Sequence, residues 1–285
     1  MKYRFTPSLL DKFQKVLDSD DFFESDFNVW SEAAAERGEC VPEQVGDYRL
    51  TAAECYAKAE QELLDAINRV PHEETRPQLL GTLLNEAVDC ILEGRNSDEY
   101  PNSIRTLRDN DKIPVAVRCM KGEFIFNFPY HGVKSIVDNL QGAIPQDRQL
   151  PKSAVLTLSN GDEVEIYGYP DYTLRDRVID LKTTGNYSYY KYERYWQRYA
   201  YPYIMVKSGE MESVSRFDFL VAQVREQKHD QLGSVTNIAE LSVESYDVDI
   251  DECEWSLKCI CSQLIRWCEE NKSSIDKFKT HIYGK

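Results

Sequence analysis

Apolar residues recur at the three- and four-residue spacing of an amphipathic helix in several stretches of the chain. The first stretch follows Thr6-Pro7, an N-cap and N1 pair that predicts a helix beginning there. Thr51, Thr75 and Asp251 are residue types that cap helix N-termini, and they predict the starts of three later helices. The later helices are predicted over residues 51–68, 75–94, 131–140, 188–207 and 251–271, with a short helical piece near 29–37.

Between these helices, alternating or continuous short apolar runs predict β-strands. Lys121-Gly122 and Asn160-Gly161-Asp162 separate two pairs of runs and indicate hairpins. Residues 95–112 are polar and are interpreted as a loop. The strands are predicted over 113–120, 123–128, 154–158, 163–167, 178–181, 217–224 and within 235–248.

The mixture of helices and strands, without repeats or a low-complexity linker, predicts an α/β protein. A chain of 285 residues can bury a large core. We expect residues 1–74 to form a helical region packed on a core built from residues 75–285, as one compact unit because no linker separates them.

The net charge of −15 argues against a protein that coats nucleic acid through general electrostatic attraction. The charge is uneven, because residues 171–207 hold seven Lys or Arg against four Asp or Glu. A basic segment in an acidic protein is typical of an enzyme that grips nucleic acid only in a cleft. Random fluctuation in an acidic protein is the alternative from charge alone.

No apolar run approaches the ~20 residues that span a bilayer, and no secretory leader is recognisable, so a cytoplasmic location without a membrane partner is expected. The eight cysteines form no C-x-x-C pair, which argues against a zinc ribbon and favours reduced thiols. No helicase P-loop of the form G-x-x-x-x-G-K-[ST] occurs.

Candidate chemistry is concentrated between residues 163 and 203. Pro170-Asp171 follows one predicted strand, and Asp180-Leu181-Lys182 ends the next, so two acids and a lysine lie at the ends of neighbouring strands. Gln197 and Tyr201 are four residues apart and therefore share one face of a helix.

These three motifs together resemble the signature of the PD-(D/E)XK nuclease superfamily, in its RecB-like and lambda-type exonuclease branch. The resemblance covers roughly residues 75–225. It implies a restriction-endonuclease-like core, a central mixed β-sheet flanked by helices, with additional N-terminal helices. It also implies a Mg²⁺- or Mn²⁺-dependent deoxyribonuclease, an exonuclease or end-processing enzyme of DNA recombination or repair. Its partners would be linear DNA ends or single strands, and a homo-oligomer is possible by analogy.

Mg²⁺ prefers carboxylate oxygens and stabilises charge on the attacking and leaving oxygens of a phosphodiester. The resemblance implies that Asp171 and Asp180 hold the metal and that the backbone carbonyl of Leu181 completes the ligand sphere. Lys182 lies on the same strand face as Asp180 and would orient or deprotonate water and offset phosphate charge. The structural alternative is that Asp171 is a turn residue and that Asp180 forms a salt bridge with Lys182.

A further metal ligand is expected from the helix over residues 75–94. RecB-like members place His there, or Glu, four residues after a Gly. Here Gly81 is followed by Asn85, a departure that leaves Asn85, Glu86 or Asp89 as the ligand. Glu86 and Asp89 are otherwise interpreted as a solvated helix face.

The resemblance also places Gln197 and Tyr201 near the scissile phosphate, whereas the structural alternative is a helix whose aromatic residues are core. The tyrosine-rich and basic segment around them has the composition of a surface that stacks bases and grips phosphates. The predicted DNA contacts are Arg175, Arg177, Thr183, Tyr190, Lys191, Arg194 and Arg198.

Some relatives hold an iron–sulfur cluster, but the late cysteines at 253, 259, 261 and 268 fit its spacing poorly, and no cluster is expected. Because Asn85 departs from the family pattern, a second hypothesis is a catalytically impaired protein that binds nucleic acid, or a scaffold, on a nuclease fold.

Overall fold

The computed structural model describes residues 2–19, 52–71, 73–94, 102–146, 151–229 and 233–275. Its helices are α1 (Pro7–Leu17), α3 (Ala52–Ile67), α4 (Arg76–Leu92), α5 (Tyr130–Asn139), α6 (Gln197–Lys207) and α7 (Ile250–Glu270), followed by the short 3-10 helix η1 (Lys272–Ser274). The cap predicted at Thr51 and the helical piece predicted near 29–37 lie outside the described residues.

The predicted starts of two helices are confirmed by their caps. Thr6 Oγ1 accepts a hydrogen bond from Leu9 N at 3.2 Å and begins α1. Thr75 and Gln78 form the capping box of α4, with Thr75 N donating to Gln78 Oε1 at 2.8 Å. The cap predicted for the last helix is wrong by two residues. Asp249 caps α7, because its side chain accepts from the amides that begin the helix.

The helix predicted over 188–207 is also wrong in its first half, because α6 begins only at Gln197. The preceding segment forms consecutive turns, in which Lys191 N donates to Ser188 O at 3.1 Å and Glu193 N to Tyr190 O at 3.1 Å. Tyr190 has a φ of 64°, in the left-handed region that an α-helix cannot accommodate. Gln197 and Tyr201 nevertheless lie one turn apart at the start of α6.

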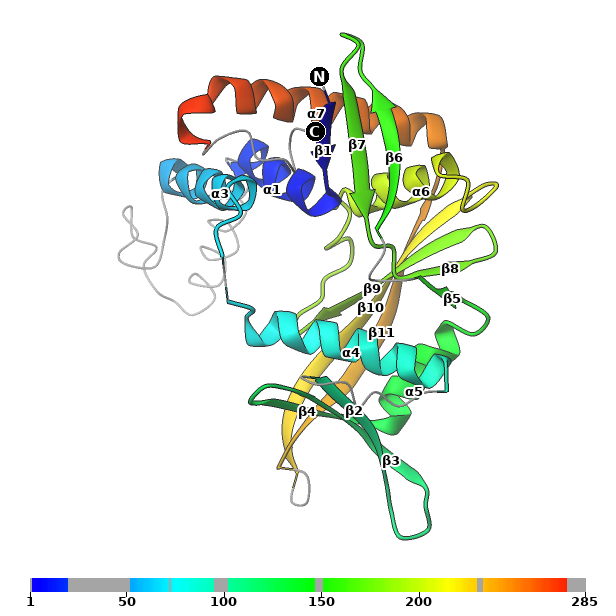
Figure 1. Ribbon diagram of the computed structural model, residues 1–285. Helices are drawn as coiled ribbons and strands as arrows, with labels where there is room; N and C mark the ends of the chain where they lie inside the picture. The colour runs from blue at the N-terminus through cyan, green and yellow to red at the C-terminus, as the bar shows by residue number, and fades with distance from the viewer. Residues whose placement is uncertain are drawn as a thin grey trace, which may run out of the picture.

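The strands form three sheets (Figure 1). An antiparallel sheet has the order β2-β3-β4 and contains β2 (Asn102–Arg108), β3 (Pro114–Lys121) and β4 (Phe124–Pro129). The loop predicted over 95–112 is therefore wrong where β2 forms. In β2 only Ile104 is buried, and the residues around it are half-buried or exposed, so the apolar pattern of the strand is weak. Pairing with β3 stabilises the strand instead.

A second sheet has the order β1-β7-β6 and contains β1 (Lys2–Phe5), β6 (Lys152–Thr157) and β7 (Glu163–Gly168). β1 is parallel to β7, with Lys2 opposite Glu163 and Phe5 opposite Ile166. Residues from the beginning of the chain thus extend the hairpin that leads into the candidate site.

The third sheet is mixed and has the order β11-β10-β9-β8-β5. The parallel pair β9–β10 lies inside it, and the other pairs are antiparallel. Its strands are β5 (Ile144–Pro145), β8 (Tyr172–Leu174), β9 (Arg177–Thr184), β10 (Arg216–His229) and β11 (Gly233–Asp247).

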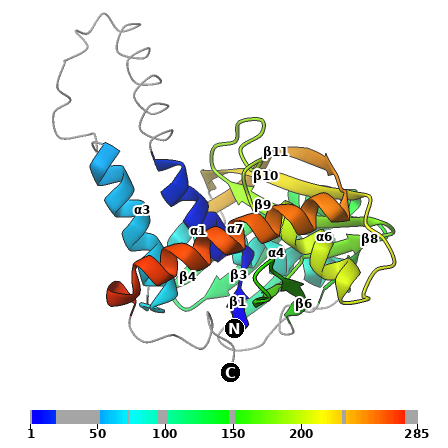
Figure 2. The same cartoon turned by 90° about the horizontal axis from the view of Figure 1, so that it is seen from above.

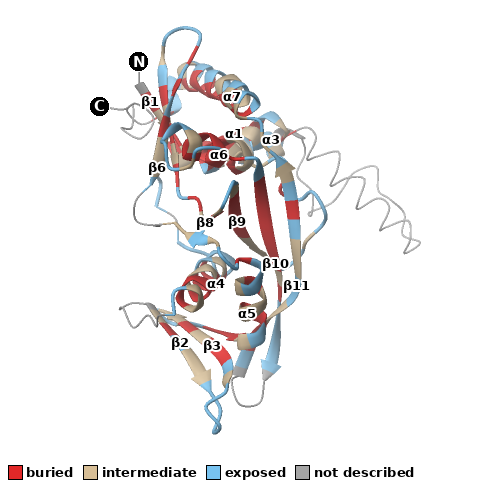
Figure 3. Cartoon of the chain, turned by 90° about the vertical axis from the view of Figure 1, so that its right-hand side faces the viewer, coloured by how far each residue is buried: buried red, intermediate tan, exposed pale blue. Residues whose placement is uncertain are grey.

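Two hydrophobic clusters lie on opposite sides of β9 and β10 (Figures 1 and 3). Val178 and Phe219 join the cluster that contains α1, α3, α6, α7 and the β1-β7-β6 sheet. Ile179 and Leu181 join the cluster that contains α4, α5 and the β2-β3-β4 sheet. Because strand side chains alternate between faces, β9 contributes to both cores. The chain is thus a mixed α/β fold whose mixed sheet is flanked by helices.

No helix in the described part of the chain is both long enough and apolar enough to span a bilayer.

Candidate functional site at strands β8 and β9

Asp171 and Asp180 meet across the β8–β9 pair rather than at the ends of β7 and β9. β8 is antiparallel to β9 with Tyr172 opposite Ile179, so Asp171, one residue earlier, lies opposite Asp180. Asp171 Oδ2 accepts a hydrogen bond from Leu181 N at 2.9 Å, which fixes its carboxylate beside β9. The expectation that the strand at 163–167 directly neighbours β9 is wrong, because β7 belongs to another sheet and the unpredicted strand β8 lies beside β9.

Asp180 and Lys182 point to the same side of β9, toward α6. Lys182 Nζ lies 2.8 Å from Asp180 Oδ2, and the two side chains are 18% and 4% exposed. Gln197 bridges this pair. Its Nε2 donates to Asp180 Oδ1 at 3.2 Å, and its Oε1 accepts from Lys182 Nζ.

Tyr201 completes the network from the next turn of α6. Its phenol oxygen accepts from Gln197 Nε2 at 3.3 Å, and the residue is buried. Burial, together with the charge of Asp180, raises the pKa of Tyr201, so the phenol keeps its proton. Gln197 and Tyr201 therefore lie at the buried end of the site, where their contacts are with protein groups. Their proximity to a scissile phosphate stays a prediction.

Lys182 is held as a cation. Burial disfavours its ammonium form, but attraction by Asp180, and to a lesser degree by Asp171 and Asp11, more than offsets that cost, so the pKa of Lys182 is raised. The ammonium also lies 5.5 Å from the ring centroids of both Tyr195 and Phe219. Neither ring could be assigned to the site from sequence, because one lies in a turn and the other in β10.

Helix α1 contributes an acid to the site that the sequence did not reveal. Asp11 Oδ1 accepts from Trp196 N at 2.7 Å, at the residue before α6. Gln14 Oε1 accepts from Trp196 Nε1 at 3.3 Å, and Asp18 pairs with Arg194 at 3.1 Å. Asp11, Gln14 and Asp18 follow an i, i+3, i+7 spacing, so they form a polar stripe on α1, and this stripe was the available signal.

Burial raises the pKa of Asp11 to about 6, although the Trp196 amide and Lys182 favour its charged form. Figure 2 shows α1 between α3 and α7 on the side of the molecule that carries α6. The polar stripe of α1 thus anchors the segment that leads into Gln197.

The α4 side of β9 is organised differently. Thr183 faces α4, where a Cβ on Gly81 would lie 3.8 Å from Thr183 Cβ. Asn85 Oδ1 and Thr183 Oγ1 are buried and have no hydrogen-bond partner within the described residues. Asp89 is buried and accepts from Tyr172 OH at 2.7 Å, so it is not part of a solvated face.

Glu86 is half-buried. In the described ranges, no three side chains of the His, Cys, Asp or Glu type are close enough together to hold a metal ion. The structure thus places Asp171 and Asp180 on neighbouring segments at β9. The identity of a ligand from α4 stays a prediction.

The seven predicted DNA contacts occupy different environments. Arg175 is exposed at the β8–β9 turn with a φ of 55°, and Tyr190 is 57% exposed. Arg194 is exposed and pairs with Asp18, and the Lys191 ammonium donates to Thr184 Oγ1 at 2.7 Å. The remaining three contact other parts of the fold. Arg177 pairs with Asp218 at 3.3 Å, and the Arg198 guanidinium lies 4.5 and 4.6 Å from the ring centroids of Tyr199 and Tyr246. Thr183 faces α4.

The aromatic segment is also divided between core and surface. Tyr192 and Tyr203 are buried in the cluster that contains α6 and α7, which agrees with the structural alternative for these residues. Tyr189 and Tyr190 are exposed, and their rings are 4.2 Å apart in an edge-to-face pair.

Comparison with known proteins gives no family. No family model matches the chain, and no curated protein matches it. The solved structure of SSO0001 aligns with 48% of this chain and about half (56%) of its own, at 12% identity and a TM-score of 0.32. A similarity of that extent supports no conclusion about the fold or activity of this chain.

Proposed function

We propose that this protein is a metal-dependent deoxyribonuclease of the PD-(D/E)XK type, with a restriction-endonuclease-like core around β8, β9 and β10. Asp171, Asp180 and Lys182 are its catalytic centre, and Gln197 and Tyr201 support them from α6. An exonuclease or end-processing activity on linear or single-stranded DNA is the form that the sequence resemblance favours.

The observation that carries the proposal is the buried network of Asp180, Lys182 and Gln197. A buried ion pair costs desolvation energy and is often no better for stability than apolar side chains of similar size. Here the pair is bridged by an amide and joined by a second carboxylate, Asp171, from the neighbouring strand. Such a concentration of charge inside a core is typical of a functional site.

The oxygen atoms of the site fit a hard divalent cation. Asp180 Oδ2 is buried and forms an ion pair with Lys182, and it accepts no other hydrogen bond from the described residues. Asp171, Asp180 and the Leu181 carbonyl would hold Mg²⁺, with an α4 residue, Asn85 or Glu86, as a further ligand. A bound Mg²⁺ would supply charge stabilisation to the phosphodiester during hydrolysis.

The protein groups would divide the remaining work. Lys182, kept protonated by its acidic neighbours, would offset the charge of a phosphate rather than remove a proton in the state described. Gln197, hydrogen-bonded to both, would fix the Lys182 ammonium and the Asp180 carboxylate relative to each other. Tyr201 would buttress Gln197 as a neutral hydrogen-bonding group.

A catalytically impaired nucleic-acid-binding protein is the second candidate. The observation that favours it is that no three acidic, His or Cys side chains in the described ranges lie close enough together to hold a metal ion. An amide at position 85 carries no negative charge, so the site has less attraction for a divalent cation than a site with three carboxylates.

Cleavage of end-labelled DNA separates the two candidates. We expect the parent protein to degrade linear or single-stranded DNA with Mg²⁺ or Mn²⁺, and no degradation with EDTA. Asp180→Ala and Lys182→Ala should each lower the rate by at least about 100-fold, the scale of losing a principal electrostatic group.

Asp138→Asn, a change of an exposed acid on α5, is the matched control and should cleave like the parent. Comparing linear with circular DNA distinguishes exonuclease from endonuclease action. Absence of metal-dependent cleavage by the parent on linear, nicked and single-stranded DNA would refute the enzyme and leave the binding protein.

A further inference from the structure

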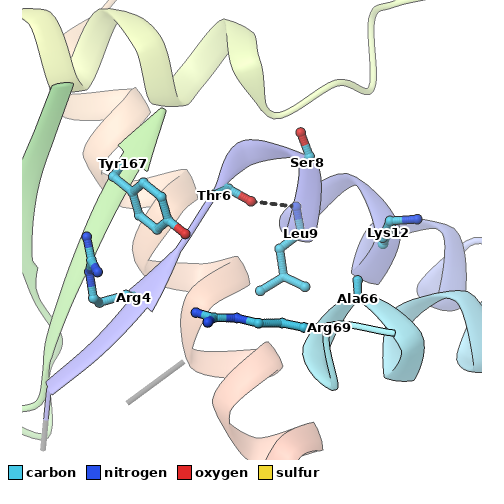
Figure 4. A pocket seen from close by; sticks show the side chains of 8 residues that line it. All are labelled: Arg4, Thr6, Ser8, Leu9, Lys12, Ala66, Arg69 and Tyr167. Atoms are coloured by element: carbon cyan, nitrogen blue, oxygen red, sulfur yellow. Dashed lines mark hydrogen bonds between the residues drawn. The ribbon is translucent and has the colours of Figure 1, made fainter. Parts of the chain in front are cut away.

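A separate basic pocket lies at the start of α1 (Figure 4). Its volume is about 380 Å³, within the range of small-ligand sites. The pocket, here called the α1 pocket, includes three cationic side chains and no acid among its lining residues. It is lined by Arg4, Thr6, Ser8, Leu9, Lys12, Ala66, Arg69 and Tyr167.

Within the part of the chain that the structure describes, two of the three cations have no counter-ion. Arg4 pairs with Glu165 at 2.8 Å and lies 4.7 Å from the centre of the Tyr167 ring. Lys12 and Arg69 form no ion pair with any residue in the described ranges, although the protein has a net charge of −15. The acid of α3 that is closest to Arg69 in the sequence, Asp65, accepts from Gln61 Nε2 at 2.6 Å.

Arg69 is directed into the pocket by the end of α3. Arg69 has a φ of 51°, and the next residue, Val70, donates its backbone N–H to Asp65 O at 2.9 Å at the end of α3. Glycine is the usual residue in this conformation, so a long cationic side chain here calls for a reason beyond ending the helix. Figure 4 shows Arg69 extended beneath Leu9 toward the side of the pocket that holds Arg4 and Thr6.

The lining has the chemistry of a phosphate site. Figure 4 shows the Arg69 guanidinium on the side of the pocket that holds Arg4, and the Lys12 amine on the opposite side. Cations that line one pocket without an acid raise its positive potential, and a bound anion offsets that charge. Thr6 Oγ1 accepts from Leu9 N, so its hydroxyl hydrogen is free to point outward, and Ser8 offers a second hydroxyl.

The α1 pocket and the candidate centre share two elements. Lys12 lines the pocket, and its neighbour Asp11 accepts a hydrogen bond from Trp196 N, at the residue before Gln197, so α1 contacts both places. Tyr167 lines the pocket, and the next residue, Gly168, packs against Tyr201.

We propose that the α1 pocket binds a phosphate of the nucleic-acid strand whose scissile bond lies at Asp180. The inference rests on the proposed function, because it needs a polynucleotide to connect the two places. Lys12 and Arg69 supply positive charge from opposite sides of the pocket, and Thr6 and Ser8 supply hydroxyl groups. The pocket thus sets affinity for the strand, and the network on β9 performs the chemistry.

Binding of a fluorescein-labelled single-stranded 20-mer in EDTA, followed by anisotropy, measures this affinity without cleavage. We expect Lys12→Gln/Arg69→Gln to weaken binding at least 10-fold and to lower the salt slope by about 1, the loss of one or two phosphate contacts. Lys134→Gln/Arg266→Gln removes the same charge from exposed positions elsewhere and should change affinity less than 3-fold.

Arg69→Gly keeps the proposal testable if a double variant folds poorly. Glycine suits the left-handed backbone at position 69, so the melting temperature should rise while affinity falls. A purely structural role for Arg69 predicts that both quantities move together. In cleavage assays, the double variant should raise KM and leave kcat within 2-fold of the parent.

Oligonucleotides with and without a 5′-terminal phosphate, and competition by inorganic phosphate, distinguish a terminal from an internal phosphate as the ligand. Equal affinities for the double variant and the charge-matched control would overturn the α1 pocket. A parent that binds no oligonucleotide overturns both proposals. A parent that binds through Lys12 and Arg69 but never cleaves overturns only the nuclease.

Discussion

At residue scale, the site depends on a few polar side chains placed where burial would otherwise penalise them. Alternation along a strand was enough to predict that Asp180 and Lys182 share a face, and helical spacing was enough for Gln197 and Tyr201. The polar stripe on α1 marks Asp11 as unusual, but the sequence does not show that Asp11 meets Trp196, which is 185 positions away.

The charge of Asp11 should lower stability above its raised pKa. The pKa of Asp11 is about 6 in the folded protein and near 4 in an unfolded chain. Above pH 6 the buried negative charge therefore lowers the free energy of unfolding, and this destabilisation disappears as the pH falls from 6 toward 4 and Asp11 is protonated. Asp11→Asn removes the charge and can still accept from Trp196 N. We expect it to raise the melting temperature at pH 7.5, and the difference from the parent to shrink toward pH 4.5.

Asp11→Ala is the matched control for that measurement, made in metal-free buffer. It removes the charge together with the hydrogen bond to Trp196 N, so any gain at pH 7.5 should be smaller than for Asp11→Asn. An Asp11→Asn protein whose advantage is independent of pH would contradict the assignment of the shifted pKa to Asp11.

At element scale, the caps and the strong apolar periods predicted most helices and strands within a few residues. The failures occur where tertiary pairing decides the outcome. β2 and β8 have weak apolar patterns and form by pairing with their neighbours β3 and β9. Residues 188–196 form turns rather than a helix because Tyr190 adopts a left-handed backbone conformation. β8 matters most, since it brings Asp171 opposite Asp180.

Two glycines at element contacts should respond to alanine with opposite signs. A Cβ on Gly168 would lie 2.7 Å from Tyr201 Cε1 and 3.4 Å from Pro7 Cδ, so Gly168→Ala should displace Tyr201. We expect a loss of about 1–3 kcal/mol in unfolding free energy, the cost of overpacking a core, together with reduced activity.

Gly81→Ala is the comparison in the same assay. Its Cβ would meet Thr183 Cβ at an ordinary 3.8 Å, and alanine is favoured over glycine in a helix by up to about 1 kcal/mol. Urea titrations of both variants test the pair. Stability unchanged in Gly168→Ala would show that Tyr201 is not confined by β7.

At the scale of the whole molecule, β9 and β10 are shared by both hydrophobic clusters, so the candidate centre lies where the two halves of the core meet. The sequence predicted an α/β fold and the basic character of residues 171–207, but it did not predict this placement. Burial on both sides of one sheet follows from topology, which local patterns do not encode.

A cation bound at Asp171 and Asp180 should therefore stabilise the entire chain. We expect 10 mM Mg²⁺ to raise the melting temperature in one cooperative transition, because ligand binding to the folded state adds RT ln(1 + [L]/Kd) to stability. Asp171→Asn should remove this increase, and Asp138→Asn, at the exposed α5 position, should retain it. A shift of equal size in Asp171→Asn would place the cation elsewhere.

The parallel pairing of β1 with β7 has a consequence for the order of events during folding. Lys2 must find Glu163, and closing a loop of that length is entropically slow compared with forming a hairpin such as β6–β7. Residues 2–19 are synthesised before β7 and before residues 194–197, so β1 and α1 cannot dock until those later segments have been made. We therefore expect the docking of β1 and α1 to be a late step in folding, and the hydrogen bond from Trp196 N to Asp11 to form with it.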